Sequence, residues 1–162
     1  MIENFLQLKS NSVKSDFQFL ILRNIEEMLD GVNISLFSQH SFIDTTKDSI
    51  TISLVHKDDS DTIATLNIFT DRISLWYGSC EINFDSFDLD INYFKDVYQD
   101  CLNGNYITTD FFLRNKLIYS STTLTTSGKK CLMPFFYRLY IKFYQRKFTS
   151  KQVHYKSFSL GL

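Results

Sequence analysis

Proline and glycine are scarce in this chain, whose 162 residues include one proline and five glycines. This scarcity excludes collagen-like chains and disordered chains rich in proline and glycine. Hydrophobic residues make up 44% of the sequence and aromatic residues 16%, proportions at which a chain of this length buries a core. The sequence therefore predicts one globular domain that spans residues 1–162.

Long apolar runs are also missing. No segment approaches the roughly 18 apolar residues that a membrane-spanning helix needs, and residues 1–9 lack the basic and apolar regions of a secretory signal. The three cysteines, Cys80, Cys101 and Cys131, are odd in number and do not have metal-ligand spacing. These features predict a cytoplasmic protein with reduced thiols and no membrane partner.

Acidic residues are absent after Asp110. All 18 acidic residues lie between Glu3 and Asp110, where only seven are basic, so this part has a net charge of −11. The remaining residues include ten Lys and Arg. Such asymmetry predicts an acidic binding surface, a basic binding surface, or two parts that neutralise each other across the fold, and the sequence leaves these three open.

Four short segments between residues 50 and 84 alternate apolar and polar residues. This period of two, with turn residues at 57–61, 71–72 and 78–80, predicts an antiparallel four-stranded meander with one buried face. The positions expected on the buried face are Ile50, Ile52, Leu54, Ala64, Leu66, Ile68, Ile73, Leu75, Tyr77, Ile82 and Phe84.

Helical patterns occur on both sides of this meander. Ser15 and Gln18 form a capping-box pair ahead of an apolar stripe that includes Phe17, Leu20, Ile21, Ile25 and Leu29, with Gly31 at the end. Asp88 or Asp90 caps a second helix that ends at Gly104. A third helix is expected after Pro134, with an aromatic stripe over 135–144 and basic residues on its other side.

The connecting segments complete the predicted fold. Residues 106–112 and 116–124 predict a hairpin that turns at Arg114 and Asn115. Residues 32–37 alternate weakly, as an extra strand would, residues 38–48 predict a polar connection, and residues 151–162 are expected to be loosely ordered. The predicted fold class is α+β, a single domain in which an antiparallel β-meander and a hairpin pack with about three helices.

No set of residues predicts catalysis, a metal site or a cofactor. His40, His56 and His154 are far apart and lack a cysteine or carboxylate at ligand spacing. Residues 59–62 are similar to the acidic loop of aspartate-nucleophile phosphatases, but Ile63 replaces the required Thr or Val. Residues 127–130 contain a Gly-Lys pair without the rest of a phosphate-binding loop. The chain is therefore expected not to be an enzyme.

The outer face of the meander and its acidic turns predict a protein-binding surface. Aromatic anchors among small polar residues, ringed by carboxylates, are typical of an interface for a basic partner. The predicted partner-binding residues are Asp58, Asp59, Asp61, Asp71, Phe69, Trp76, Glu81 and Asp85. The alternative is that Trp76 and Phe69 pack beneath the first or third helix. In the third helix, the aromatics share one stripe, which favours core packing over nucleic-acid binding.

Several short motifs resemble small bacterial immunity proteins. They are the Trp-Tyr-Gly at 76–78, residues 81–85 before a helix, the Leu-Asn-Gly at 102–104 and the Arg-Asn-Lys at 114–116. Immunity proteins protect a cell from the C-terminal toxin domain of contact-dependent inhibition or related polymorphic toxin systems. The resemblance covers residues 50–124 and implies a non-catalytic protein that covers the toxin's active site or substrate surface, but it fixes no binding residue. The basic last third departs from a simply acidic inhibitor.

Two other functions remain open at this stage. The expected order of elements is similar to that of the dimeric chaperones that hold effector proteins before type III secretion, although their last helix is usually acidic. A nucleic-acid-binding protein of a phage or mobile element, using the basic third helix, is the other alternative. The sequence does not define the oligomeric state or the identity of a toxin.

Overall fold

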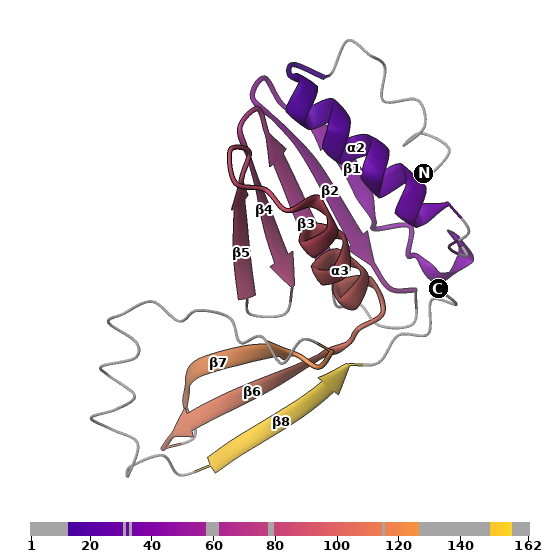
Figure 1. Cartoon of the computed structure of the whole chain (residues 1–162). Coiled ribbons are helices and arrows are strands. Elements are labelled where there is room, and N and C mark those ends of the chain that lie inside the picture. Colours follow the sequence, from indigo (N-terminus) through magenta and orange to yellow (C-terminus); the bar gives the residue numbers. More distant parts are fainter. Residues whose placement is uncertain are drawn as a thin grey trace.

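The computed structural model describes residues 13–30, 32, 34–57, 62–77, 80–114, 116–126 and 150–156. It shows an α+β fold that contains a five-stranded and a three-stranded antiparallel sheet (Figure 1). The elements are α2 (Asp16–Leu29), the 3-10 turn η2 (Ile34–Leu36), β1 (Phe42–Thr45), β2 (Ser49–Val55), β3 (Thr62–Phe69), β4 (Arg72–Tyr77), β5 (Cys80–Asp85), α3 (Ile91–Leu102), β6 (Tyr106–Leu113), β7 (Lys116–Leu124) and β8 (Ser150–Lys156).

The five-stranded sheet follows chain order, β1-β2-β3-β4-β5, and its last four strands confirm the predicted meander. Its register aligns Ile52 with Leu66, Leu66 with Leu75, and Leu75 with Ile82. Since side chains alternate across a strand, this register gathers most of the apolar residues of the strands on one face. That face is the inner face of the sheet.

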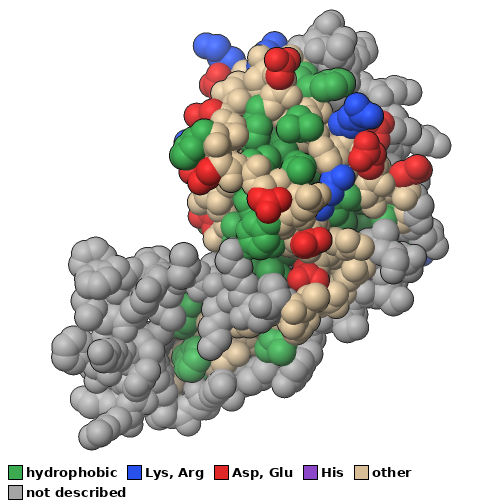
Figure 2. Space-filling model, viewed as in Figure 1, with side chains coloured by type: hydrophobic (Ala, Val, Ile, Leu, Met, Phe, Trp, Pro, Cys, Tyr) green, Lys and Arg blue, Asp and Glu red, His purple; other side chains and the backbone are tan. Residues whose placement is uncertain are grey.

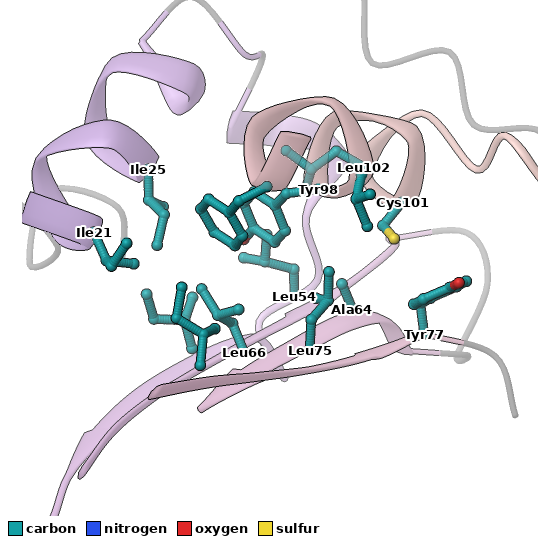
Figure 3. Packing of buried hydrophobic residues seen from close by; sticks show 14 of the residues in the cluster. Ile21, Ile25, Leu54, Ala64, Leu66, Leu75, Tyr77, Tyr98, Cys101 and Leu102 are labelled. Carbon is teal, nitrogen blue, oxygen red and sulfur yellow. The ribbon is translucent and has the colours of Figure 1, made fainter. Parts of the chain in front are cut away.

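Helices α2 and α3 cover the inner face (Figure 1). Ile21 and Ile25 of α2 point toward the sheet, as do Tyr98, Cys101 and Leu102 of α3 (Figure 3). The sheet contributes apolar residues from neighbouring strands to the same cluster, and most of these side chains are fully buried. Burial of this apolar surface is the main stabilising contribution to the fold.

Both helices begin with the capping hydrogen bonds that the sequence predicted. Ser15 Oγ accepts a hydrogen bond from the main-chain N–H of Gln18 at 3.1 Å. Asp90 is the N-cap of α3, where its Oδ1 accepts hydrogen bonds from the N–H groups of Asn92 and Tyr93. Gly104 has a φ of 65° just after α3, a left-handed conformation that suits glycine.

The three-stranded sheet, ordered β7-β6-β8, packs by one end against the larger body. Tyr106 and Leu124 belong to the main core, and the Tyr106 ring meets the Tyr77 ring edge-on with centroids 5.7 Å apart. Asp100, a buried carboxylate of α3, accepts a hydrogen bond from Thr126 Oγ1 at 2.7 Å. The predicted β6–β7 hairpin is confirmed, with Arg114 at a positive φ of 50° in its turn.

Several predictions about connecting segments are wrong. Residues 42–45, expected in a polar connection, form the edge strand β1. The described residues of the segment 32–37 do not form a strand; they contain η2, followed by an isolated bridge between Phe37 and His56. Residues 151–156 are not loose but belong to β8, which pairs with β6 through backbone hydrogen bonds, and the rest of the segment expected to be loosely ordered, 157–162, lies outside the described residues. Each strand is short or polar, so it lacks the apolar alternation on which the prediction depended.

The buried stripe of α2 also differs from the prediction. Leu20 is 47% exposed, whereas Leu22 is buried with Ile21 and Ile25. Two polar side chains of α2 are also buried. Gln18 donates to the carbonyl of Ile68 and Asn24 donates to the carbonyl of Leu20, so neither amide is buried without a partner.

The remaining predictions concern the third helix, the end of the first helix and the cysteines, which the structure describes only in part or not at all. The predicted third helix and the end of the predicted first helix at Gly31 lie outside the described residues. Cys80 is disulfide-bonded, which contradicts the expectation of reduced thiols, and its partner also lies outside the described residues. Cys101 is a buried free thiol.

Candidate functional site

The face of the five-stranded sheet opposite α2 and α3, here called the outer face, carries the candidate site. Successive side chains of a strand point to opposite faces of the sheet. The residues that alternate with the buried apolar ones therefore point to the outer face. The register arranges them in rows across the strands. The first row is Phe42, Ser53, Thr65, Trp76 and Glu81, the second is Asp44, Thr51, Asn67, Ser74 and Asn83, and the third contains Ser49, Phe69, Arg72 and Asp85.

The second row consists of polar side chains, and three of them, Thr51, Asn67 and Ser74, bond within the row or to the adjoining row. Thr51 Oγ1 donates a hydrogen bond to Asn67 Oδ1 at 2.8 Å. Ser74 Oγ donates to Glu81 Oε1 at 2.6 Å, which holds this carboxylate against the sheet. Because the side chains in this row are short, larger side chains on each side rise above them.

Aromatic and charged residues flank this row. Trp76 is 45% exposed and lies directly opposite Glu81 in the pairing of β4 with β5. On the other side of the row, the guanidinium carbon of Arg72 lies 4.6 Å from the centroid of the Phe69 ring, a cation–π contact. Arg72 is paired in register with Asp85 at the end of β5.

These rows enclose a shallow hollow of about 480 Å³ on the outer face. Both aromatic residues and both carboxylates contribute to its walls. Its lining residues are Asn67, Phe69, Arg72, Ser74, Trp76, Glu81, Asn83 and Asp85. The hollow therefore combines an exposed indole, two carboxylates, two amides and one guanidinium within three adjacent strands.

The opposite side of the molecule, which carries the helices, has a different surface. Figure 2 shows this side, where acidic side chains are scattered among apolar and other polar groups rather than gathered in one place. Its exposed aromatic on α2 is Phe19, which is 61% exposed. Phe19 therefore offers a comparison for the exposed Trp76 on the outer face.

The structure brings together half of the predicted site residues. Phe69, Trp76, Glu81 and Asp85 all line the hollow. The alternative that Trp76 and Phe69 pack beneath the first helix is wrong, because α2 and α3 pack on the inner face. The third helix of that alternative lies outside the described residues. Asp71 is exposed in the turn between β3 and β4. The three remaining predicted residues, Asp58, Asp59 and Asp61, lie outside the described residues.

Four of the lining residues, Asn67, Arg72, Ser74 and Asn83, are not among the predicted partner-binding residues. Of these, the sequence predicts Arg72 in a turn and does not place Asn83 on the outer face. Both follow the same alternation as their neighbours, since Arg72 precedes Ser74 and Trp76 by two and four positions, and Asn83 lies between Glu81 and Asp85. Extending the period of two to the ends of β4 and β5 would have found them.

The buried titratable groups lie in the core rather than in the hollow. Burial raises the pKa of the Cys101 thiol well above its usual value, and the nearby Asp100 carboxylate raises it further. Burial likewise raises the pKa of the Tyr77 and Tyr98 hydroxyls. A thiol held in its protonated form is a poor nucleophile, so Cys101 has a structural environment rather than a catalytic one.

The described part of the chain contains no group of three or more His, Cys, Asp or Glu residues placed to hold a metal ion. Among the same residues, no helix combines the length and apolarity required to cross a membrane. Comparison of the chain with protein-family models, curated proteins and solved structures finds no match.

Proposed function

We propose that this protein is a non-enzymatic immunity protein that binds a bacterial toxin domain through the outer face and blocks the toxin's active site or substrate surface. The observation that carries the proposal is the exposed Trp76 in a hollow that also contains Glu81 and Asp85. Interfaces gain most of their binding energy from a few such aromatic residues surrounded by polar groups.

The composition of the outer face favours a protein as the partner. A sheet face of five strands offers a broad surface, and its small polar side chains can hydrogen-bond directly or through water. Two carboxylates and one guanidinium line the hollow, so its formal charge is −1. Asp44 adds a further carboxylate on the same face. A basic partner surface is therefore attracted to this face and oriented by it.

The immunity role rests on the motif resemblance and is supported by this charge. The described residues of the motifs at 76–78 and 81–85 that resemble immunity proteins lie in β4 and β5, two strands that line the hollow. Many of the toxins in such systems are basic nucleases, for which an acidic inhibitor is suited. The third predicted helix and its basic residues are not needed for this mode of binding.

Capture from the native host tests the proposal. The tagged full chain, a Trp76→Ala variant and a Phe19→Ala variant are used as baits, and retained proteins are identified by mass spectrometry. We expect wild type and Phe19→Ala to retain the C-terminal part of a large secreted protein in stoichiometric amount, and Trp76→Ala to lose most of it. Phe19 is a matched control because it is an exposed aromatic on the opposite side of the molecule.

Neutralisation then tests the immunity role itself. Cells that express the captured toxin domain should grow when they also express wild type or Phe19→Ala, and should not grow with Trp76→Ala. Retention of the N-terminal segment of a secreted effector, without growth protection, would instead identify a secretion chaperone. Retention of nucleic acid alone would favour a nucleic-acid-binding protein of a phage or mobile element and reject the immunity role.

Location in the cytoplasm is part of the proposal, and the disulfide at Cys80 makes it testable. Protein disulfides are rare in the reducing cytosol and persist in oxidising compartments. Acid quenching of cells, alkylation and mass spectrometry measure the redox state of Cys80 in the host. Reduced Cys80 agrees with the cytoplasm, whereas a stable disulfide moves the protein and its partner to an oxidising compartment.

A further inference from the structure

The hollow on the outer face has hydrogen-bonding groups that the described chain does not use. The Asp85 carboxylate, the Asn83 amide and the indole N–H of Trp76 make no hydrogen bond or ion pair with any described residue. These three groups lie on adjacent strands around one concave surface. The hollow is therefore equipped to bond a group supplied by another molecule.

The arrangement of charge decides which kind of group it accepts. Arg72 lies in register with Asp85, yet these two side chains do not form an ion pair, because the guanidinium stacks on the Phe69 ring. Glu81 is held by Ser74 beside Trp76. The hollow therefore offers the indole of Trp76 and two carboxylates to a ligand. The guanidinium of Arg72, the cation of the hollow, is already in contact with the Phe69 ring.

We propose that the partner inserts one arginine or lysine side chain into this hollow. Its cationic group lies against the indole of Trp76, which is the strongest of the natural aromatic partners for a cation. Its N–H groups donate to the carboxylates of Glu81 and Asp85, and charge-assisted hydrogen bonds of this kind are stronger than neutral ones. The inference rests on the proposed function and defines the contact at the centre of that interface.

Arg72 has an opposing effect in this arrangement. Its positive charge lies at the edge of the same hollow and repels an incoming cation, although its stacking on Phe69 keeps it away from Asp85. Removing this charge with Arg72→Gln should strengthen binding of a cationic side chain. The same substitution should weaken binding of any anionic ligand, so the sign of its effect identifies the charge of the occupant.

Trp76 provides a specific signal because it is the sole tryptophan of the chain. The test titrates the full-length protein with N-acetyl-Gly-Arg-Gly-amide at low salt and follows both tryptophan fluorescence and the indole N–H resonance. The matched probes are peptides with citrulline or glutamate in place of arginine. Citrulline keeps the shape of arginine and removes its charge, so it isolates the contribution of the cation.

We expect saturable binding of the arginine peptide and at least about fivefold weaker binding of the citrulline peptide. Asp85→Asn and Glu81→Gln should each weaken arginine binding about fivefold, and Arg72→Gln should tighten it a few-fold. Asp96→Asn, an exposed change on α3, should leave the affinity unchanged. Equal affinity for both peptides, no binding of the arginine peptide, or preference for the glutamate peptide would overturn the inference.

The captured toxin domain distinguishes failure of this inference from failure of the proposed function. If Trp76→Ala abolishes toxin binding but Asp85→Asn and Glu81→Gln leave it unchanged, the outer face is the interface and the inserted cation is rejected. If Trp76→Ala leaves toxin binding unchanged, the outer face is not the interface and both proposals are rejected. Loss of binding with all three variants supports both.

Discussion

The side-chain Nε2 of Gln18 donates a hydrogen bond to the main-chain carbonyl oxygen of Ile68, 3.2 Å away and 50 positions further along the chain. The Oε1 of the same amide accepts a hydrogen bond from the main-chain N–H of Lys14 at 2.7 Å. Ser15 Oγ contacts the carbonyl of Thr70 at 3.1 Å. The first turn of α2 is thereby joined to the end of β3, next to the turn that leads to Arg72.

Truncating Gln18 should therefore destabilise the whole domain. Gln18→Ala leaves a buried carbonyl without its partner and creates a small cavity, and we expect the free energy of unfolding to fall by about 2–3 kcal/mol. Urea denaturation followed by circular dichroism measures the change. Gln99→Ala, at an exposed position of α3, is the matched control and should change stability by less than about 0.5 kcal/mol. Equal effects of the two substitutions would contradict this role of Gln18.

The sequence predicts a helix or strand correctly where the residue pattern and the structure it specifies both involve residues close together in the chain. The four strands of the meander alternate apolar and polar residues over most of their length because each has one face on the core, and Asp90 caps α3 within three residues of itself. In contrast, β8 is a polar strand whose position depends on backbone pairing with β6, about 40 residues earlier. Nothing in its own side-chain pattern indicates that pairing.

The candidate site was predictable to the same extent. Alternation placed Phe69 and Trp76 on one face, and the structure confirms that both line one hollow. The hollow itself depends on cross-strand register, which aligns Asn67 with Ser74 and Ser74 with Asn83. Register is set by turn geometry and by core packing of the opposite face, so it could not be obtained from any one strand.

The buried carboxylate of Asp100 should contribute to the attachment of the second sheet. It accepts hydrogen bonds from Thr126 Oγ1 at 2.7 Å and Asn105 Nδ2 at 3.4 Å, which connect the end of α3 with both ends of the β6–β7 hairpin. Asp100→Ala removes these bonds to a charged group and should lower the free energy of unfolding by about 2 kcal/mol.

The control for Asp100 is Asp96→Ala, which removes an exposed carboxylate from the same helix. Its expected effect is below about 0.5 kcal/mol. Hydrogen exchange supplies a second measurement, because loosening of the hairpin should accelerate exchange in β6 and β7 more than in β3 and β4. Uniform acceleration across both sheets would show that Asp100 stabilises the domain as a whole rather than this attachment.

Stability should fall at alkaline pH because three buried acids have raised pKa values. Burial raises the pKa of Cys101, Tyr77 and Tyr98 in the folded protein, with a smaller contribution from neighbouring negative charges. The unfolded chain releases these protons at the usual values, near 9 for the thiol and 10 for the hydroxyls. Above those values the unfolded state binds fewer protons, so stability decreases as pH rises.

The pH dependence can be assigned by substitution of the thiol. Each fully titrating group contributes a slope of about 1.4 kcal/mol per pH unit. Wild type should lose stability from about pH 9, whereas Cys101→Ala should begin to lose it nearer pH 10, where the tyrosines titrate. Urea denaturation at half-unit steps from pH 8 to 11 provides the profile. Identical profiles would exclude Cys101 as the first group to titrate.

The carboxylates that the sequence predicted near the binding face should govern how fast the partner associates. Reversing Asp58, Asp59 and Asp61 to Lys should lower the association rate with the captured toxin domain about tenfold at low salt, since long-range attraction steers encounter more than it holds the complex. The dissociation rate should change little. Stopped-flow measurement of Trp76 fluorescence at several salt concentrations separates the two rates, and the difference between variant and wild type should shrink as salt rises. The matched control reverses Glu26 and Glu27 of α2 and Asp30, its C-cap residue. Since α2 covers the other side of the sheet, this control should affect association less. An unchanged association rate for the first variant at low salt would remove these three carboxylates from the binding surface, while equal slowing by both variants would mean that overall charge, and not its position on the outer face, drives encounter.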